Sequence, residues 1–123
     1  MALKVEIIGM KETVENLKEI NRKIIQSTMV AISEGGILLK EEIEQSIQGN
    51  RAESRSVDTG EVLESIENTN ITGGVKISSD VPQSVYMEFG TSKIPERRHF
   101  RNSLERVKPI IEERIVEEIV KTI

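Results

Sequence analysis

The apolar positions of the chain follow two different periods in succession. Over residues 3 to 9, Leu3, Val5 and Ile7 alternate with charged neighbours, which is the two-residue period of a half-buried strand. From residue 11 to about residue 47, apolar residues recur mostly every three or four positions and draw one stripe along a helix. The pattern therefore predicts a strand followed by a long helix.

Two adjacent glycines lie inside this predicted helix. Gly35 and Gly36 either divide the helix in two or permit the close approach of another element. The question matters because a glycine costs a helix interior about 1 kcal/mol relative to alanine. We expect one continuous or bent helix that runs to Ser46 or Gln48, rather than a clean break.

Residues 48 to 57 have the composition of a loop, and the residues that follow have the pattern of a helix N-terminus. Residues 48 to 57 are almost free of apolar side chains and show no periodicity, so we expect a mobile loop that a partner can order. Asp58 is placed to cap a short helix over residues 59 to 66, and Val57 and Val62 stand at the two positions of a hydrophobic staple. The residues of this helix expected to face inward are Val62, Leu63 and Ile66.

The chain then predicts a hairpin and completes the fold class. Two β-rich pieces around Gly73 and Gly74 are typical of a β-hairpin, with Ile71, Val75 and Ile77 buried. We expect an α+β fold in which two long helices pack on a small, mostly antiparallel sheet, with a short helix after the 48 to 57 loop. A chain of 123 residues suits one domain spanning residues 1 to 123.

The second long helix is predicted at the C-terminal end. Residues 82 to 89 fit either a short helix or a strand, with Gly90 as their stop. Over residues 100 to 123 the apolar positions again recur every three or four residues, which predicts a helix. Pro109 lies inside it, and because an interior proline costs about 3 kcal/mol, we expect a kink or a restart near residues 107 and 108.

Composition narrows the chemistry that the chain can perform. It contains no cysteine and one histidine, which excludes thiolate nucleophiles, cysteine metal sites and multi-histidine zinc sites, so we expect neither a cofactor nor a metal. No apolar run is long enough to cross a membrane, and we expect a protein made in the cytoplasm. The net charge of −4 argues against general nucleic-acid binding.

The charge is unevenly distributed along the chain. Residues 93 to 108 hold six basic residues against two acidic ones, a local charge of +4. This basic segment is either a solvated surface or a docking surface for an acidic partner.

The triplet Asp58-Thr59-Gly60 is also the signature of aspartic proteases, whose retroviral members are dimers of chains about this long. In such a dimer, two carboxylates share a proton in a dry cleft of an all-β body. Here the triplet precedes Glu61 and a helical pattern, and about half of the chain is predicted to be helical. We therefore prefer the helix-capping role of Asp58 and keep the protease as the enzymatic alternative.

All three aromatic residues, one tyrosine and two phenylalanines, lie in one stretch, VYMEFGTSKIPERRHF, which also holds the only histidine. If its first part is helical, Tyr86 and Phe89 cover the sheet, and Phe100 folds back onto the same place. The loop between them then carries an exposed Ile94, as a small docking loop does. His99 lies among arginines that disfavour its protonated form, so we expect a structural or solvent-facing role rather than a catalytic base.

The chain contains two motifs, VDTGEVLESI and, about 20 residues later, VYMEFGTSKIPERRHFRNSL. Together they resemble the head-tail joining, or tail-completion, proteins of long-tailed bacteriophages and proviruses. His99 and Ser103 stand where the family usually has prolines, so the loop before the last helix departs from the pattern. The residues that match are Asp58, Thr59, Gly60, Leu63, Ser65, Ile66, Tyr86, Glu88, Phe89, Gly90, Thr91 and Phe100.

This resemblance implies a structural function. Such proteins are small virion components that assemble, usually as a six-fold ring, at the neck between the head connector and the tail tube. The implied partners are copies of the chain, the connector or adaptor, and the tail tube or tail terminator, with DNA only in transit. The alternative of the same class is another small neck or tail assembly module.

A ring requires one patch of each subunit to meet a different patch of its neighbour. The basic segment facing the acidic remainder of the next subunit is one candidate contact, and the 48 to 57 loop is a second. Glu88 and Thr91 either maintain the fold, by capping the following loop or pairing with Arg97 or Arg98, or take part in recognition. The candidate interface residues are Lys93, Ile94, Arg97, Arg98 and Arg101.

Overall fold

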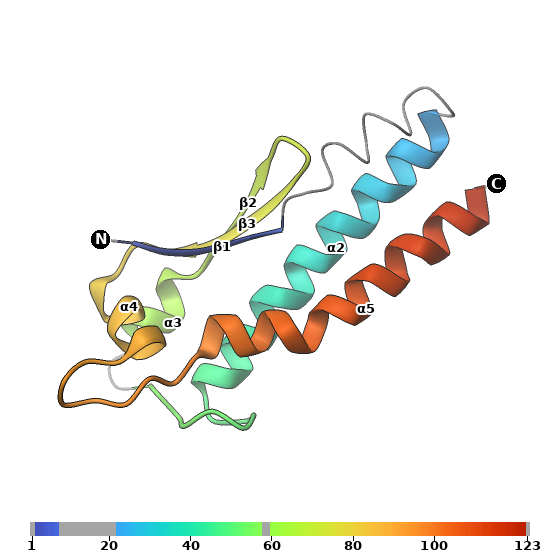
Figure 1. Cartoon of the computed structure of the whole chain (residues 1–123). Coiled ribbons are helices and arrows are strands. Elements are labelled where there is room, and N and C mark those ends of the chain that lie inside the picture. The colour runs from blue at the N-terminus through green and yellow to red at the C-terminus, as the bar shows by residue number, and fades with distance from the viewer. Residues whose placement is uncertain (1, 8–21, 58–59, 123) are drawn as a thin grey trace.

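The computed structural model describes residues 2 to 7, 22 to 57 and 60 to 122. Its fold is α+β, as the sequence predicts: two long helices lie side by side, and a small antiparallel sheet packs against them (Figure 1). The elements are β1 (Leu3–Ile7), α2 (Arg22–Ile47), α3 (Glu61–Ser65), β2 (Glu67–Ile71), β3 (Gly74–Ser79), α4 (Pro82–Phe89) and α5 (His99–Thr122).

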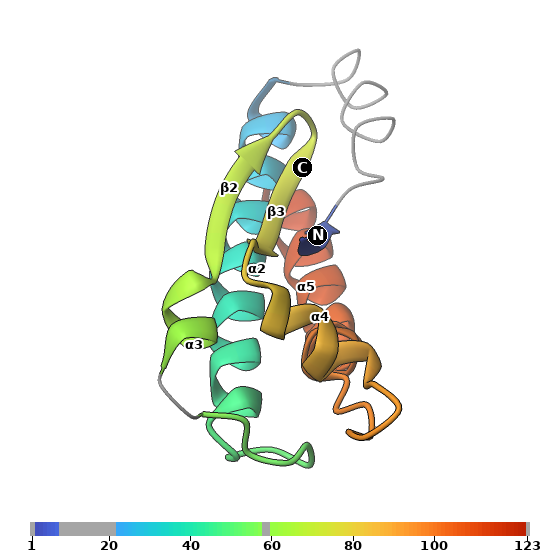
Figure 2. The same cartoon turned by 90° about the vertical axis from the view of Figure 1, so that its left-hand side faces the viewer.

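The sheet has β3 at its centre, with β1 and β2 antiparallel on its two sides. Ile77 of β3 pairs with Val5 of β1 and with Asn68 of β2. Val75 and Ile77 are buried, and Figure 2 shows α2 behind the sheet, on the side that these residues face. The predicted hairpin is confirmed, with Gly73 in its turn at a positive φ of 76°. The predicted burial of Ile71 is wrong, because this residue at the end of the edge strand β2 is only half-buried.

The glycine pair of α2 lets two elements approach the helix closely. A Cβ atom on Gly35 would lie 3.0 Å from Cγ2 of Ile111 in α5, and one on Gly36 would lie 2.8 Å from Cγ2 of Val75 in β3. The helix is continuous through both residues. The expectation of an unbroken helix is confirmed, and the close approach is its physical reason.

The hydrophobic core lies between α2, α5 and the buried face of the sheet. α2 contributes its inward stripe, which ends at Ile47 as predicted, while the predicted helical positions 11 to 21 lie outside the described residues. The core residues are Leu3, Ala31, Ile32, Leu39, Ile43, Ile47, Val62, Ile66, Val75, Ile77, Val81, Phe100, Val107, Ile111 and Ile115.

The short helix α3 begins later than the sequence predicts. Its N-cap position is occupied by Gly60, which has a φ of 83° and offers no side-chain hydrogen bond. The cap predicted for Asp58 is therefore wrong in position, and Asp58 and Thr59 themselves lie outside the described residues. Val62 and Ile66 are buried and Leu63 packs against the core, so the inward face is confirmed.

The ambiguous segment before Gly90 is the helix α4. Gly90 ends it by donating its backbone N–H to the carbonyl of Tyr86 at 2.8 Å. The last helix, α5, is continuous through Pro109, so the predicted alternative of a restart is wrong. Figure 1 shows the axis of α5 bending between its first turns and its C-terminal half.

The prediction that Tyr86 and Phe89 cover the sheet is wrong. Tyr86 is 48% exposed and Phe89 is 54% exposed. The cause is that α4 turns Ser84 and Glu88 inward, four residues apart, which leaves both aromatic rings on its outer face. Phe100 is buried and Ile94 is exposed, as expected.

Candidate functional site

Four segments converge at the end of the molecule opposite the C-terminus: the 48 to 57 loop, α4, the 90 to 98 loop and the start of α5 (Figure 1). Most residues of the second motif lie here. Those of the first motif that the structure describes lie next to them, in and around α3. Ser65 of α3 contacts Ser79 of β3 at 2.6 Å, and Ser79 contacts Ser84 of α4 at 2.5 Å, so hydroxyl groups link these elements.

Glu88 caps the N-terminus of α5 from a buried position. Its carboxylate accepts hydrogen bonds from the backbone N–H groups of Phe100, at 2.8 Å, and Arg101, at 2.9 Å. It also accepts from Nε of Arg101 at 2.8 Å. Burial lowers the pKa of Arg101, but the hydrogen bonds and charges of Glu88 and Glu96 together raise it more, so the guanidinium stays charged. The fold-maintaining interpretation is confirmed, although the capped amides belong to α5 rather than to the following loop, and the paired arginine is Arg101 and not Arg97 or Arg98.

Thr91 and Gly90 set the course of the 90 to 98 loop. The hydroxyl oxygen of Thr91 accepts from the backbone N–H groups of Lys93, at 3.2 Å, and Ile94, at 3.1 Å. A Cβ atom on Gly90 would lie 2.7 Å from the backbone nitrogen of Glu96. The loop therefore folds tightly back toward α4, with Ile94 at its exposed side.

Glu53 anchors the 48 to 57 loop to α5. This glutamate is only 8% exposed and forms two hydrogen bonds with Arg106, at 2.7 and 2.9 Å. It also accepts from Ser46 at 2.5 Å and from Asn102 at 3.1 Å. Burial raises the pKa of Glu53, but the hydrogen bonds from Arg106, Ser46 and Asn102 outweigh it and hold the pKa at about 2. The segment has no helix or strand, as expected, and its mobility stays a prediction.

His99 is buried between two serines, which makes it structural and excludes the solvent-facing alternative. Its Nδ1 lies 2.7 Å from Oγ of Ser46, and its Nε2 lies 2.7 Å from Oγ of Ser56. Burial lowers the pKa of His99, and the nearby charges of Glu53 and Glu88 act in the opposite direction. The histidine thus joins α2, the 48 to 57 loop and α5.

The contact between Ser56 and His99 has the geometry of a nucleophile and a general base. However, Oγ of Ser56 also lies 3.0 Å from the carbonyl oxygen of Ser54 and accepts from Nη1 of Arg97 at 2.7 Å. Arg97 occupies one acceptor position of this hydroxyl, and the carbonyl oxygen of Ser54 and Nε2 of His99 compete for its single proton. The arrangement holds the loop in place rather than presenting a free hydroxyl to a substrate.

Much of the positive charge of the basic segment is neutralised within the fold. Arg101 pairs with Glu88, and Arg106 pairs with Glu53 and with Glu42, the latter at 2.8 Å. Arg98 lies 3.7 Å from Glu96. Within residues 2–7, 22–57 and 60–122, neither Lys93 nor Arg97 pairs with a carboxylate. Of the predicted interface residues, Lys93, Ile94, Arg97 and Arg98 remain available at the surface, whereas Arg101 is largely committed to the fold.

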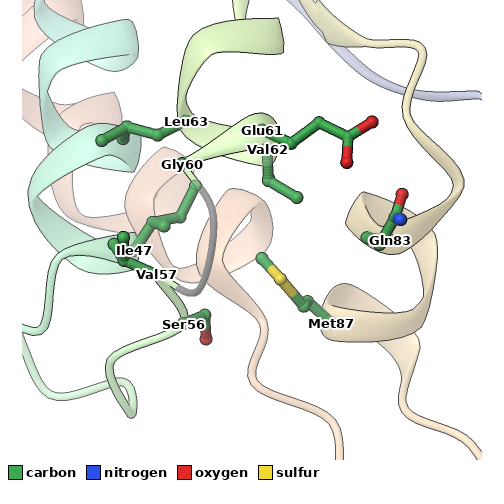
Figure 3. A pocket seen from close by; sticks show the side chains of 9 residues that line it. All are labelled: Ile47, Ser56, Val57, Gly60, Glu61, Val62, Leu63, Gln83 and Met87. Atoms are coloured by element: carbon green, nitrogen blue, oxygen red, sulfur yellow. The ribbon is translucent and has the colours of Figure 1, made fainter.

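A groove runs along α4 beside these residues. Its outer part has a volume of about 290 Å³ and continues into a smaller hollow of about 170 Å³ between α3 and α4. In that hollow, Met87 of α4 and Val62 of α3 point toward one another (Figure 3). We call the outer part the α4 groove; its lining includes Arg55, Val57, Tyr86, Met87, Ile94 and Arg97.

Sequence reasoning missed the polar network that supports this surface. Glu53, Ser46 and Ser56 gave no signal, because they lie among polar residues without periodicity or at a helix end. The one available signal was His99, which departs from the proline usual in the resembling family. In the structure that histidine is the centre of the network.

Within the described ranges, no helix is long and apolar enough to cross a membrane. The same residues contain no group of three or more side chains arranged to hold a metal ion. No protein-family model matches the chain, and neither the curated proteins nor the solved structures include a similar one.

Proposed function

We propose that this chain is a structural virion protein of the head-tail neck, which assembles with copies of itself and joins the tail to the head connector. The proposal is supported by the two roles that the residues of the second motif have in the structure. Glu88, Gly90 and Thr91 hold the backbone of α4 and the 90 to 98 loop in place, whereas Tyr86 and Phe89 face outward.

The outward residues are largely exposed in a single subunit, although the ring of Phe89 lies 4.7 Å from the guanidinium of Arg101. Tyr86, Phe89 and Ile94 are each at least 42% exposed and lie on adjacent segments. An apolar surface of this kind, next to cations that pair with no carboxylate of the described residues, is typical of a protein contact. The inward residues fix its shape before any partner arrives, which lowers the entropic cost of association.

The proposal places the protein in the neck of the particle, with a connector or adaptor on one side and the tail tube or terminator on the other. DNA passes through without a dedicated site. Another neck or tail assembly module is compatible with the same surface. The aspartic protease has less support, because the described residues are mostly helical and do not form the all-β body that such an active site needs.

Native mass spectrometry of the purified chain over a wide concentration range tests the proposal. We expect assemblies larger than a dimer, with six copies as the principal species. A chain that remains monomeric, or that stops at a tight dimer, would count against a ring-forming neck protein and make a peptidase assay on Asp58→Asn worthwhile.

A further inference from the structure

We infer that the α4 groove receives the outer face of the C-terminal half of α5 from a second copy of this chain. This inference rests on the proposed function, because it names the two surfaces through which the copies associate. The α4 groove supplies apolar walls and positive charge, and the face of α5 supplies apolar side chains and negative charge.

The α4 groove has the size and chemistry of a site for a few aliphatic side chains. Its volume of about 290 Å³ lies between Val57, Met87 and Ile94. Tyr86 also lines it and is 48% exposed, so the aromatic ring can cover an incoming side chain.

Two arginines of the α4 groove have no acidic partner in the described part of the chain. Arg55 makes a single hydrogen bond, to the carbonyl oxygen of Val57 at 3.3 Å. Arg97 donates to Oγ of Ser56 at 2.7 Å and pairs with no carboxylate. An incoming carboxylate can therefore bind here without breaking an ion pair of the subunit.

The complementary surface lies on α5. Val116 is 58% exposed and Val120 is 65% exposed, and their spacing of four residues puts both on one face of the helix. Glu113 lies on the same face, and Glu117 lies beside it. Glu113 forms no ion pair within the described ranges, while Glu117 lies 3.9 Å from Arg114, at the limit of an ion pair. We call these four residues the α5 stripe.

The α5 stripe and the α4 groove match in spacing and in charge. Two side chains four residues apart on a helix stand about 6 Å apart along its axis, a separation that one short groove can accept. With Val116 and Val120 inserted, the two glutamates flank the anchors and can face Arg55 and Arg97. Burial of the valines supplies affinity, and the charges set orientation.

The two surfaces also lie at opposite ends of the molecule. Figure 1 shows α4 and the 90 to 98 loop at one end of the long axis and the C-terminus of α5 at the other. A subunit therefore cannot fill its own groove. Copies that associate in series through these patches form a ring or a filament, and two antiparallel copies form a reciprocal dimer.

The first experiment compares Val116→Ser/Val120→Ser with wild type by native mass spectrometry. Both valines are exposed, so the fold should be kept, which circular dichroism verifies. The control is Val30→Ser/Ile37→Ser, which removes two apolar side chains that are 53% and 55% exposed on α2. We expect the α5 stripe variant to associate at least about tenfold more weakly, and the control to associate like wild type. Equal effects in both variants would overturn the inference.

The second experiment reverses the charges. We expect Arg55→Glu to weaken association, and Glu113→Lys/Glu117→Lys to weaken it as well. The chain with all three changes should recover much of the affinity, because the attraction is restored with opposite signs. A triple variant that associates no better than either partial variant would contradict the docking mode.

The outcomes separate this inference from the proposed function. Rings that persist unchanged in the α5 stripe variant would overturn the docking alone. A wild-type dimer that the α5 stripe variant abolishes would support the docking and contradict the ring. A wild-type chain that stays monomeric would contradict both.

Discussion

Glu88 binds Arg101 through both the backbone and the side chain: its Oε2 atom accepts from the backbone nitrogen at 2.9 Å and from Nε at 2.8 Å. Its other oxygen caps Phe100. The carboxylate therefore joins the end of α4 to the first turn of α5, with the 90 to 98 loop closed between them. The shape of the proposed interaction surface depends on this single buried acid.

Replacing Glu88 by glutamine should destabilise the fold by about 2 to 3 kcal/mol, because an amide offers one acceptor where the carboxylate offers two, and leaves Arg101 without its buried partner. Urea unfolding measures the loss. The control is Glu96→Gln: Glu96 also contacts Arg101, at 3.3 Å, but it is exposed, and the expected loss is under about 0.5 kcal/mol. A Glu88→Gln chain of unchanged stability that no longer assembles would instead give Glu88 a recognition role.

His99 should make stability depend on pH below about 6.5. Burial lowers the pKa of His99 in the folded state, so the unfolded chain takes up a proton near pH 6.5 and the folded chain only at lower pH. The contribution of neutral His99 is therefore present above pH 6.5 and is lost as the pH falls. Chemical unfolding at pH 5.5 and 7.5 measures the difference, which should shrink in His99→Gln. A pH slope that persists unchanged in this variant would place its origin in other groups.

Glu53 should govern a separate loss of stability in acid. Its folded pKa of about 2 lies below the model-compound value of 4.5, so its contribution is complete above pH 4.5 and declines as the pH falls toward 2. We expect Glu53→Gln to cost roughly 3 kcal/mol of stability at pH 7, because Arg106 then loses its buried partner. The variant should also lose less stability as the pH falls, because the titrating carboxyl group is gone. Glu64→Gln, at an exposed position of α3, is the matched control and should leave both quantities nearly unchanged.

Gly36→Ala should destabilise the protein although alanine favours helices. The gain in helix propensity is about 1 kcal/mol, but the new methyl group would lie 2.8 Å from Cγ2 of Val75 and push α2 away from β3. We expect a net loss of about 1 to 2 kcal/mol in thermal unfolding. Ser33→Ala, at an exposed position of the same helix, should be neutral or slightly stabilising. A stabilised Gly36→Ala would contradict the close packing of α2 on the sheet.

The order of the elements followed from apolar periodicity, because the burial of one face is what sets the period of strands and helices. The two long helices and the hairpin are examples. Periodicity gives no information about polar partners that are distant in the chain. Ser46 and His99 are 53 residues apart and meet only because α2 and α5 pack side by side.

The same limit explains the error at α4. Aromatic residues in a chain with few of them suggest a core, and the sequence favoured Tyr86 and Phe89 as inward residues. The first backbone N–H groups of α5 have no acceptor within the helix, and Glu88 faces inward because its carboxylate accepts hydrogen bonds from them. The motif included Glu88, Gly90 and Thr91 but did not show whether they hold the backbone in place or face a partner. Only the three-dimensional arrangement shows which residues do each.

The central claim, a role in the neck of a tailed particle, is tested most directly by immunogold electron microscopy of particles from cells that produce the chain. With an antibody raised against the purified protein, the account predicts label at the head-tail junction of intact particles. Label along the tail tube or over the head, or particles that contain none of the protein, would contradict it.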